Sequence, residues 1–351
     1  MSIALSQREA AVLGHVVETY LQTGEPVGSQ VVARAFAVAA QTSLSSASIR
    51  NIMADLEVAG LLTHPHPSAG RVPTSCGLRY FVDCLVETPP LSDVEQRAMQ
   101  AQYAQTEPEL HAILGEASRL LSRLSHYAGI VVRPARRELV FRQMQFVKLS
   151  ERRLLGIFVT REGVTQNRVI DVEQEQSYLD LERINNYCNA AFLGLTLVEA
   201  RAKATHELTV AQREVDDWAT RAMRFAAATL AKDERDAAAD LVVEGSSQLL
   251  ECPEFAENPR TRALLAALEE RQQIAALLAR AEASDEMQVF IGGESGYDAL
   301  SECSVVVSPY HRGGAVLGTL GVIGPTRMAY GRVIPLVQCT AMQVSEWLGK
   351  Q

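Results

Sequence analysis

Three short helical patterns occupy the first 60 residues of the 351-residue chain, and they limit the folds open to this segment. The first and third have clear start and stop signals, whereas the end of the second is blurred by the Ala-rich, uncharged stretch after Phe36. Ser6 and Glu9 have the spacing of a capping box, and the pattern that follows stops at Gly24. A second, shorter helix is expected from Ser29. The side chains at helical spacing that we expect to face inward are Val12, Leu13, Val16, Tyr20, Leu21, Val32, Ala35 and Phe36.

The third helical pattern has one apolar face and one small polar face. A serine within residues 44–46 caps it, and Gly60 ends it. The apolar face carries Ile49, Ile52, Met53 and Leu56. At about 100° per residue, the opposite face carries Ala47, Arg50, Asn51 and Ala54. Such a face fits a DNA major groove, because Arg can bond both acceptors of guanine and Asn can pair with adenine. The alternative is an ordinary solvated helix face.

Two short strands are predicted after this helix. Residues 61–64 and 71–73 have strand character, and residues 65–70 form a turn-rich loop between them. Three helices and a hairpin make a winged helix-turn-helix, in which the third helix lies in the major groove and the hairpin tip reaches the flanking backbone or minor groove. The candidate DNA-binding residues are therefore Ser46, Ala47, Ser48, Arg50, Asn51, Ala54, His66, Ser68 and Arg71.

The charge of the chain argues against nonspecific binding to nucleic acid. The chain has 33 Lys and Arg against 42 Asp and Glu, a net charge of −9, whereas nucleic-acid-binding domains are usually basic. Residues 1–88 hold five Arg, no Lys and seven acids, a net charge of −2. Because little counterion would be released, affinity must depend on a few positioned Arg, helix N-termini and two copies acting together. A dimer is therefore expected.

Beyond Pro89 and Pro90 the pattern alternates between helix and strand. A helical linker is expected over residues 89–125, with a break at Pro108. Runs of strand character then predict one antiparallel meander, over residues 129–132, 139–147, 154–159 and 164–172. A helix over residues 178–192 would cover one face of it.

The last third begins with an acidic, Ala-rich segment. Residues 207–283 carry nine basic and 15 acidic side chains, with helices expected near 210–230 and 261–283. Strand character returns over residues 287–291, 304–307 and 315–322, and a final helix is expected over about 334–348. The predicted fold class is α+β and multidomain: one α+β domain interrupted by a helical insertion.

Other candidate sites are weaker. Residues 133–153 carry seven basic and two acidic side chains, which would suit a second nucleic-acid surface, but Lys and Arg on edge strands also discourage sheet association. Glycines at 292–293, 313–314 and 318–324 lack the spacing of phosphate loops and are better explained as turns. His64 and His66 lack Cys or carboxylate partners at ligand spacing, so no metal site is predicted. No catalytic constellation and no cofactor site is found, so an enzyme is not expected.

Several ordered motifs lie at the two ends of the chain. In the first 88 residues they are Gly24-Glu25-Pro26-Val27-Gly28-Ser29, Ser48-Ile49-Arg50-Asn51, Met53-Ala54-Asp55-Leu56-Glu57, Gly60-Leu61-Leu62 and Ser68-Ala69-Gly70-Arg71-Val72-Pro73-Thr74. Near the carboxyl end there is Gly321-Val322-Ile323-Gly324-Pro325-Thr326-Arg327-Met328-Ala329-Tyr330. These motifs resemble the HrcA family of bacterial heat-inducible transcription repressors, the last as its second signature, and residues 291–294 and 303–306 resemble weaker signatures. The family pattern is departed from at Ser75-Cys76-Gly77 and in the longer, less polar loop over 37–45.

This resemblance implies a domain plan and a function. The plan is a winged-helix domain over residues 1–88, the helical linker over 89–125, a GAF-like antiparallel α+β domain over 126–206 and 284–351, and an inserted helical dimerising domain over 207–283. The implied function is repression of chaperone operons through an inverted-repeat operator (CIRCE), with the GroEL chaperonin keeping the dimeric repressor active. The alternative is a regulator whose GAF-like domain senses a small molecule.

The sequence also suggests where the protein works. It has no signal-peptide pattern and no charge-free apolar run of about 18 residues, so no membrane association and a cytoplasmic location are expected. The six cysteines form no C-x-x-C pair and are expected to be reduced and mostly buried.

Overall fold

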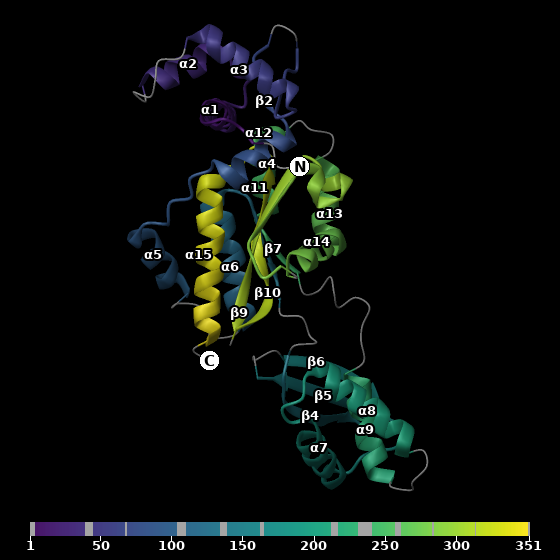
Figure 1. The fold of residues 1–351 in the computed structure, drawn as a ribbon. Helices are drawn as coiled ribbons and strands as arrows, with labels where there is room; N and C mark the ends of the chain where they lie inside the picture. Colours follow the sequence, from purple (N-terminus) through teal and green to yellow (C-terminus); the bar gives the residue numbers. More distant parts are fainter. Residues whose placement is uncertain are drawn as a thin grey trace.

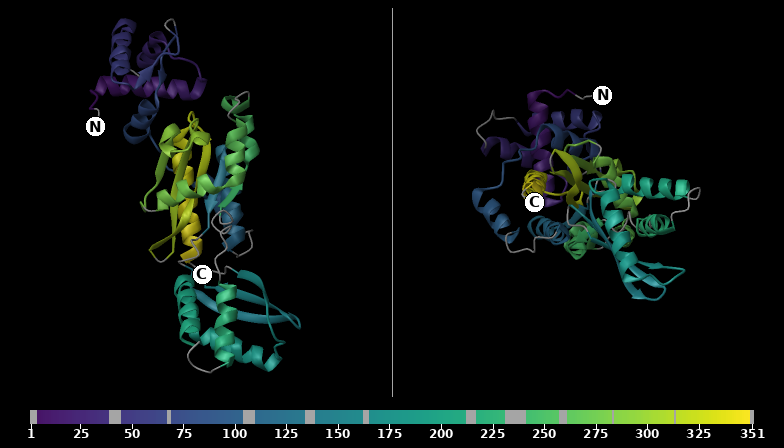
Figure 2. Two further views of the ribbon diagram at one scale, coloured as in Figure 1. Left: turned by 90° about the vertical axis from the view of Figure 1, so that its right-hand side faces the viewer. Right: turned by 90° about the horizontal axis from the view of Figure 1, so that it is seen from below.

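The computed structural model describes residues 4–38, 45–66, 69–103, 110–133, 139–161, 165–211, 217–230, 241–256, 261–282, 284–312 and 314–349. These residues form three units that follow one another along the molecule (Figure 1). The amino-terminal unit is mainly helical, the central unit contains a five-stranded sheet, and the inserted unit contains a three-stranded sheet. Figure 1 and the left view of Figure 2 place the amino-terminal and inserted units at opposite ends of the central unit.

The amino-terminal unit contains the three helices that the sequence predicts. They are α1 (Gln7–Thr23), α2 (Ser29–Val38) and α3 (Ser46–Val58), and α4 (Ser75–Cys84) follows them. The predicted capping box is present: the Ser6 N–H donates to Glu9 Oε2 at 2.8 Å, and the Glu9 N–H donates to Ser6 Oγ at 3.3 Å. The left-handed conformation of Gly24 ends α1. Of the predicted inward side chains, Tyr20, Leu21, Ala35 and Ile52 are only half-buried.

A short hairpin packs against the first loop of this unit. Its strands β1 (Leu62–Thr63) and β2 (Val72–Pro73) are antiparallel, as predicted. Val27 and Arg71 exchange two backbone hydrogen bonds of 2.9 Å, which join the hairpin to the loop between α1 and α2. At Gly70 a Cβ atom would lie 2.5 Å from the Val27 carbonyl carbon, so this close approach requires glycine.

The central unit is an antiparallel sheet between two helical layers. Its strands are β3 (Ala128–Val132), β7 (Leu241–Glu244), β8 (Gln288–Ile291), β9 (Cys303–Arg312) and β10 (Ala315–Pro325), in the order β7-β3-β10-β9-β8. Val131, Val306 and Val322 face α6 (Leu110–Ser125) and α15 (Tyr330–Gly349). Ile130, Val305 and Ile323 face the layer of α13 (Thr261–Glu270) and α14 (Gln272–Glu282). The remaining described elements are α5 (Asp93–Tyr103), α11 (Ser246–Glu251), α12 (Pro253–Ala256), η2 (Gly292–Ser295) and η3 (Asp298–Leu300).

The inserted unit has a core of its own. Strands β4 (Phe141–Ser150), β5 (Arg153–Thr160) and β6 (Thr165–Asp171) form an antiparallel sheet in the order β4-β5-β6. Helices α7 (Tyr178–Phe192), α8 (Leu197–Ala211) and α9 (Asp217–Thr229) complete the unit. Their apolar side chains and the inward residues of the sheet form one cluster, separate from the clusters of the central unit. The predicted helix over 178–192 is confirmed.

The structure corrects the predicted meander and the boundaries drawn from it. β3 pairs with β7 and β10, whereas β4, β5 and β6 form their own sheet. The reason is burial: β3 is covered on both faces, while β4 alternates buried and exposed residues and has one covered face. Helices α13 and α14, expected within an insertion over 207–283, bury their Leu and Ile side chains against the five-stranded sheet instead. The inserted unit therefore spans residues 139–230, and the expected boundaries at 206 and 284 do not coincide with the cores.

Three smaller expectations also change. Strand β7 lies in a segment where only helix was expected. Helix α6, expected in a linker, buries Ile113, Leu114 and Leu121 and belongs to the central unit, while Pro108 lies outside the described residues. Gly318, Gly321 and Gly324 lie within β10 rather than in turns. Their neighbours explain the glycines, since a Cβ at Gly321 would lie 2.0 Å from the Val306 carbonyl oxygen.

The cysteines are all free, and only half of them are buried. Cys188, Cys303 and Cys339 are buried, Cys252 is half-buried, and Cys76 and Cys84 are exposed. The prediction that the cysteines are reduced is consistent with this arrangement, but the prediction of general burial is wrong for Cys76 and Cys84. In the described part of the chain, no helix has the length and apolar character needed to cross a membrane.

The contact between β3 and α6 predicts a strict requirement for glycine at position 129. A Cβ at Gly129 would lie 2.0 Å from the Ser118 carbonyl oxygen, and the Ser118 hydroxyl donates to the Gly129 carbonyl at 2.9 Å. Gly129→Ala should therefore lower the free energy of unfolding by about 1–3 kcal/mol, as measured by urea denaturation. Gly293→Ala, where a Cβ meets nothing within 4 Å, is the control and should change it by less than about 0.5 kcal/mol. Equal stability of the two variants would contradict the close approach.

Candidate nucleic-acid interface

The outer face of α3 exposes two side chains that are able to read bases. The Ser48 N–H donates to Ser45 Oγ at 3.1 Å, which caps the helix at its start. Ile49, Met53 and Leu56 lie on one face of α3 and are buried, so the opposite face of the helix is turned outward. Ala47, Ser48, Arg50 and Asn51 are exposed, and Ala54 is half-buried. Among the residues that the structure describes, none forms a side-chain hydrogen bond or ion pair with Arg50 or Asn51. Both side chains are available to an external partner.

The N-termini of α2 and α3 lie beside each other. Ser29 in the first turn of α2 and Ser46 in the first turn of α3 join through their hydroxyl oxygens, 3.1 Å apart. Ser46 is half-buried by this contact, so it joins two helices rather than standing free on the surface. Free backbone N–H groups and the helix dipole make helix starts favourable for anions. This pair of helix starts is therefore suited to a phosphate group.

Arg71 points back to α3 rather than outward from the hairpin. Its Nε donates to Glu57 Oε2 at 3.0 Å, and its side chain is only 21% exposed. His64 Nδ1 pairs with the other carboxylate oxygen of Glu57. Partial burial acts to raise the pKa of Glu57, but the hydrogen bonds from Arg71 and His64 outweigh it and hold that pKa below its usual value. The three side chains form a latch between the hairpin and α3.

The structure describes only some of the residues predicted at the tip of the hairpin. His66 is exposed on the hairpin loop, and Ser68 lies outside the described residues. The structure thus brings the α3 candidates together on one face, while Arg71 has a structural partner at the base of the hairpin.

The sequence reasoning missed the role of Glu57. A signal was present, because a carboxylate in the last turn of a helix opposes the helix dipole and is favoured only with a cationic partner. His64 and Arg71 supply that partner from the hairpin that follows.

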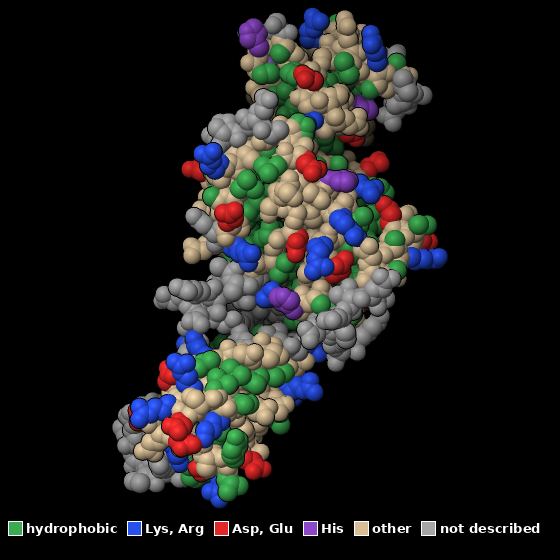
Figure 3. Space-filling model, turned by 180° about the vertical axis from the view of Figure 1, so that it is seen from behind, with side chains coloured by type: hydrophobic (Ala, Val, Ile, Leu, Met, Phe, Trp, Pro, Cys, Tyr) green, Lys and Arg blue, Asp and Glu red, His purple; other side chains and the backbone are tan. Residues whose placement is uncertain are grey.

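The arginines of the amino-terminal unit divide into two groups. Arg71 and Arg79 are held in ion pairs with carboxylates. Arg8, Arg34 and Arg50 are exposed and have no carboxylate partner among the described residues. Figure 3 shows basic and His side chains at the end of this unit that lies farthest from the rest of the molecule. The positive charge available to a phosphate backbone is therefore small but outward-facing.

The structure adds little support for a function at the weaker candidate sites. In the basic segment, Lys148 pairs with Glu175, Arg153 pairs with Asp171, and β4 is an edge strand, which favours the edge-protection interpretation. No group of three or more potential metal ligands occurs in the part of the chain that the structure describes. Burial raises the pKa of the Cys188 and Cys303 thiols to about 12, the opposite of what a nucleophile needs.

Comparison with known proteins identifies relatives over nearly the whole chain. The family model described as the HrcA protein C terminal domain matches residues 111–334. The heat-inducible transcription repressor HrcA of Geobacter sulfurreducens is 40% identical over 344 residues, which cover 98% of this chain and 98% of the relative. The HrcA repressor of Methylobacillus flagellatus is 41% identical over 345 residues, again covering 98% of each chain. That of Xanthomonas campestris is 40% identical over 340 residues, covering 97% of this chain and 95% of the relative.

One solved structure has the same overall fold. A crystal structure described as a hypothetical protein aligns over 99% of both chains with a TM-score of 0.62 and 22% sequence identity. At this identity the similarity concerns the fold alone.

A small helical unit with an outward-facing polar helix, attached to a larger body of sheet and helices, is typical of transcription regulators. The full-length relatives are transcription repressors, so the role of the chain is regulatory rather than catalytic. The chain belongs to the HrcA family of heat-inducible transcription repressors. The resemblance seen in its sequence motifs is thereby confirmed.

The latch between the hairpin and α3 makes a prediction about the acidity of Glu57. Arg71→Ala should raise the pKa of Glu57 toward 4.5, its ordinary value, because a hydrogen bond that favours the carboxylate is lost. In the wild type, the lowered pKa stabilises the fold above pH 4.5, and this stabilisation is lost as the pH falls through the lower folded-state value. Carboxyl carbon shifts followed by NMR over a pH series measure the change. Arg34→Ala, which removes an unpaired exposed Arg from α2, should leave the Glu57 titration unchanged; an unshifted pKa in Arg71→Ala would show that the latch does not form.

Proposed function

We propose that this protein represses heat-shock chaperone operons by binding an inverted-repeat operator (CIRCE) as a dimer. The observation that carries the proposal is the exposed face of α3, where Arg50 and Asn51 stand beside each other without partners among the described residues. Arg and Asn are the side chains best suited to guanine and adenine in the major groove. The full-length HrcA relatives support repression of heat-inducible genes.

In this proposal the amino-terminal unit is a winged helix. Helix α3 enters the major groove with Arg50 and Asn51 nearest the bases, and Ala47, Ser48 and Ala54 allow close approach. Ser29 and Ser46 present the starts of α2 and α3 to a phosphate. His66 and Ser68 approach the flanking backbone from the hairpin, and Arg71 positions the hairpin through Glu57 while offering its remaining donors to the duplex.

A dimer is needed because a single copy presents little positive charge. We place the dimer contact on the outer face of the sheet in the inserted unit. Cross-strand pairing aligns Val147, Leu155 and Val169 in one row, and Ile157 and Val159 extend the apolar surface along the central strand. None of these five side chains joins a buried core cluster, since α7 and α9 cover the opposite face. A second copy of the same face is the occupant that a two-fold dimer requires.

Helix α7 covers one edge of this sheet, along β4. Asn189 accepts a hydrogen bond from the Met144 N–H at 2.7 Å and donates to the Met144 carbonyl at 2.9 Å. Asn185 accepts from the Phe146 N–H at 2.8 Å. These contacts from α7 satisfy backbone groups along β4, so extension of the sheet across that edge is disfavoured.

The central unit is proposed to be the GAF-like domain, and GroEL-type chaperonin is proposed to maintain the active repressor. The inserted unit exposes large apolar side chains, among them Leu149, Tyr178, Leu179 and Leu193, a surface of the kind that chaperonins retain. Heat would divert the chaperonin to unfolded clients and lower the amount of active dimer. Repression in the cytoplasm follows from this partner.

A small-molecule sensor is the second candidate, supported by one groove. A cavity of about 560 Å³ lies between residues 88–96, β9 and α15, and Gln96, His311 and Gln338 line it together with apolar side chains. Operator binding measured after heating, with and without chaperonin, separates the two candidates. Recovery that needs chaperonin supports the first, whereas a metabolite that changes DNA affinity without chaperonin supports the second.

The role of Arg50 can be tested directly. Arg50→Ala should weaken binding to the inverted repeat by about 10- to 100-fold, because one bidentate base contact contributes about 1–3 kcal/mol. Binding to a scrambled duplex should change little. Fluorescence anisotropy at fixed salt measures both affinities. Arg119→Ala, which removes a 55% exposed Arg from α6, is the matched control and should bind as the wild type does. Wild-type affinity of the Arg50 variant would show that α3 is not the reading helix.

The dimer surface makes a separate prediction. Ile157→Lys places a charge in the middle of the apolar face and should raise the dimer dissociation constant at least about 10-fold, because two like charges would be buried without partners. Sedimentation equilibrium measures this constant. Leu179→Lys changes a side chain that is 70% exposed on α7, outside the face, and should leave the dimer intact. A fully dimeric Ile157 variant would place the dimer contact elsewhere.

A further inference from the structure

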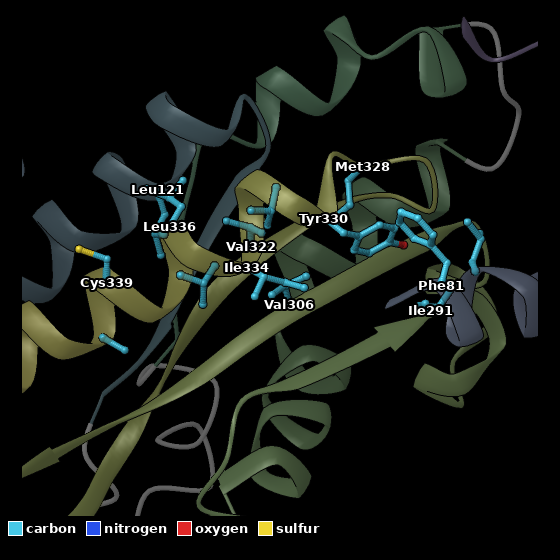
Figure 4. Close-up of a cluster of buried hydrophobic side chains, with 14 of the residues drawn as sticks. Phe81, Leu121, Ile291, Val306, Val322, Met328, Tyr330, Ile334, Leu336 and Cys339 are labelled. Carbon is cyan, nitrogen blue, oxygen red and sulfur yellow. The ribbon is translucent and has the colours of Figure 1, made fainter. Parts of the chain in front are cut away.

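The amino-terminal unit is joined to the central unit by more than the chain that connects them. Phe81 of α4 packs beside Ile291, Met328 and Tyr330 of the central unit (Figure 4), and all four side chains belong to one buried cluster. Tyr330 is fixed in turn, since its hydroxyl donates to the Thr326 carbonyl at 2.8 Å and lies 2.7 Å from Ser304 Oγ. This apolar contact holds the two units together.

One ion-pair clamp lies on α4. The Arg79 Nε donates to Glu294 Oε1 at 3.0 Å, and Arg79 also bonds the second carboxylate oxygen of Glu294 and the Val289 carbonyl. Burial opposes ionisation of Glu294, but the hydrogen bond from Arg79 outweighs it and lowers the pKa of Glu294. Glu294 lies in the segment 291–294, which resembles one of the weaker family signatures. We call this contact the Arg79 clamp.

A second clamp lies at the carboxyl end of α1. Arg327, in the turn before α15, pairs with Glu254 of α12, and its Nη1 lies 3.4 Å from the Leu21 carbonyl oxygen. Helix α1 has no basic side chain in its own last turn, so Arg327 supplies the positive charge that its dipole favours there. A Cβ at Gly24 would lie 2.8 Å from the Arg327 guanidinium, so the guanidinium rests directly on the helix end. We call this contact the Arg327 clamp.

We propose that the Arg79 and Arg327 clamps are positioning contacts that fix the orientation of the amino-terminal unit and thereby set the spacing between operator half-sites. The proposal rests on the proposed dimeric binding of an inverted repeat. An apolar contact is non-directional, whereas two arginines bonded at separate points, on α4 and at the end of α1, resist rotation about it. The side chain of Arg79 is 28% exposed and that of Arg327 is 17% exposed, so water screens both only partly.

Half-site spacing gives a readout that simple destabilisation does not move. Inverted repeats whose spacer is varied in single base pairs over about one helical turn are titrated with the full-length protein. For the wild type, affinity should fall steeply when the spacer changes by about half a turn. Arg79→Ala combined with Arg327→Ala should flatten this profile and lose about 10-fold in affinity at the best spacer, because the second half-site contact loses effective concentration. Binding to a single half-site should stay within about twofold of wild type.

A matched control removes a third arginine from the same region. Arg332→Ala deletes a 60% exposed side chain that pairs with Glu95 of α5, inside the central unit. Its spacing profile should match the wild type. If the double variant fails to fold by urea denaturation, Arg327→Ala alone is used and should flatten the profile in part.

A second measurement tests the clamps without DNA. Spin labels are attached at Glu18→Cys on α1 and Met342→Cys on α15, both exposed positions, with the exposed Cys76 and Cys84 changed to Ser. Removing the clamps should broaden the distance distribution between the labels. An unchanged distribution, an unchanged spacing profile, or tighter binding at every spacer would overturn the proposal. If the wild type binds no inverted repeat but removing the clamps still broadens the distribution, the proposed function is refuted and the clamps stand.

Discussion

The continuous apolar core that runs from α1 to α15 is the contact on which the rest of the structure depends. Val16 and Met53 of the amino-terminal unit, Phe81 at its boundary, and Val322 and Val337 of the central unit belong to one buried cluster. The two units therefore cannot separate without exposing apolar surface to water. Among the described residues, the inserted unit has a buried cluster of its own, separate from those of the central unit. The shared core therefore fixes the amino-terminal unit on the central unit.

The acidic net charge of the chain explains why the orientation of the amino-terminal unit matters for the proposed binding to DNA. With a net charge of −9, and of −2 over residues 1–88, the chain gains little affinity for DNA from nonspecific electrostatic attraction. Two of the five arginines in the amino-terminal unit are used to hold structure, Arg71 within the unit and Arg79 across its boundary. In the proposed dimer, the three that remain exposed act together when both copies reach their half-sites. A regulator built in this way gains specificity from geometry and loses affinity readily when that geometry is disturbed.

Local signals in the sequence predict most of the helices, but they do not predict which strands pair in the five-stranded sheet. The cap at Ser6, the stop at Gly24 and the stripe from Ile49 to Leu56 are short-range features, and α1 and α3 form where they predict. Strand β3 was assigned to the wrong sheet because its partners, β7 and β10, lie more than 100 residues further along the chain, and no local pattern encodes that pairing. The α3 face was predictable from helical spacing, whereas the partner of Arg71 depended on how closely the hairpin approaches Glu57.

Two segments that resemble family signatures, residues 291–294 and 321–330, each contain a side chain that contacts the amino-terminal unit. Arg327 and Glu294 are remote in sequence from α3, yet both contact the amino-terminal unit, one at the end of α1 and one at α4. Both side chains therefore bond the amino-terminal unit across its boundary with the central unit. Since the dimer surface is proposed at the far end of the molecule, every constraint between the two DNA-reading helices must pass through the central sheet. In the proposed dimer, a loss of order along that path would weaken operator binding without changing a residue that touches DNA.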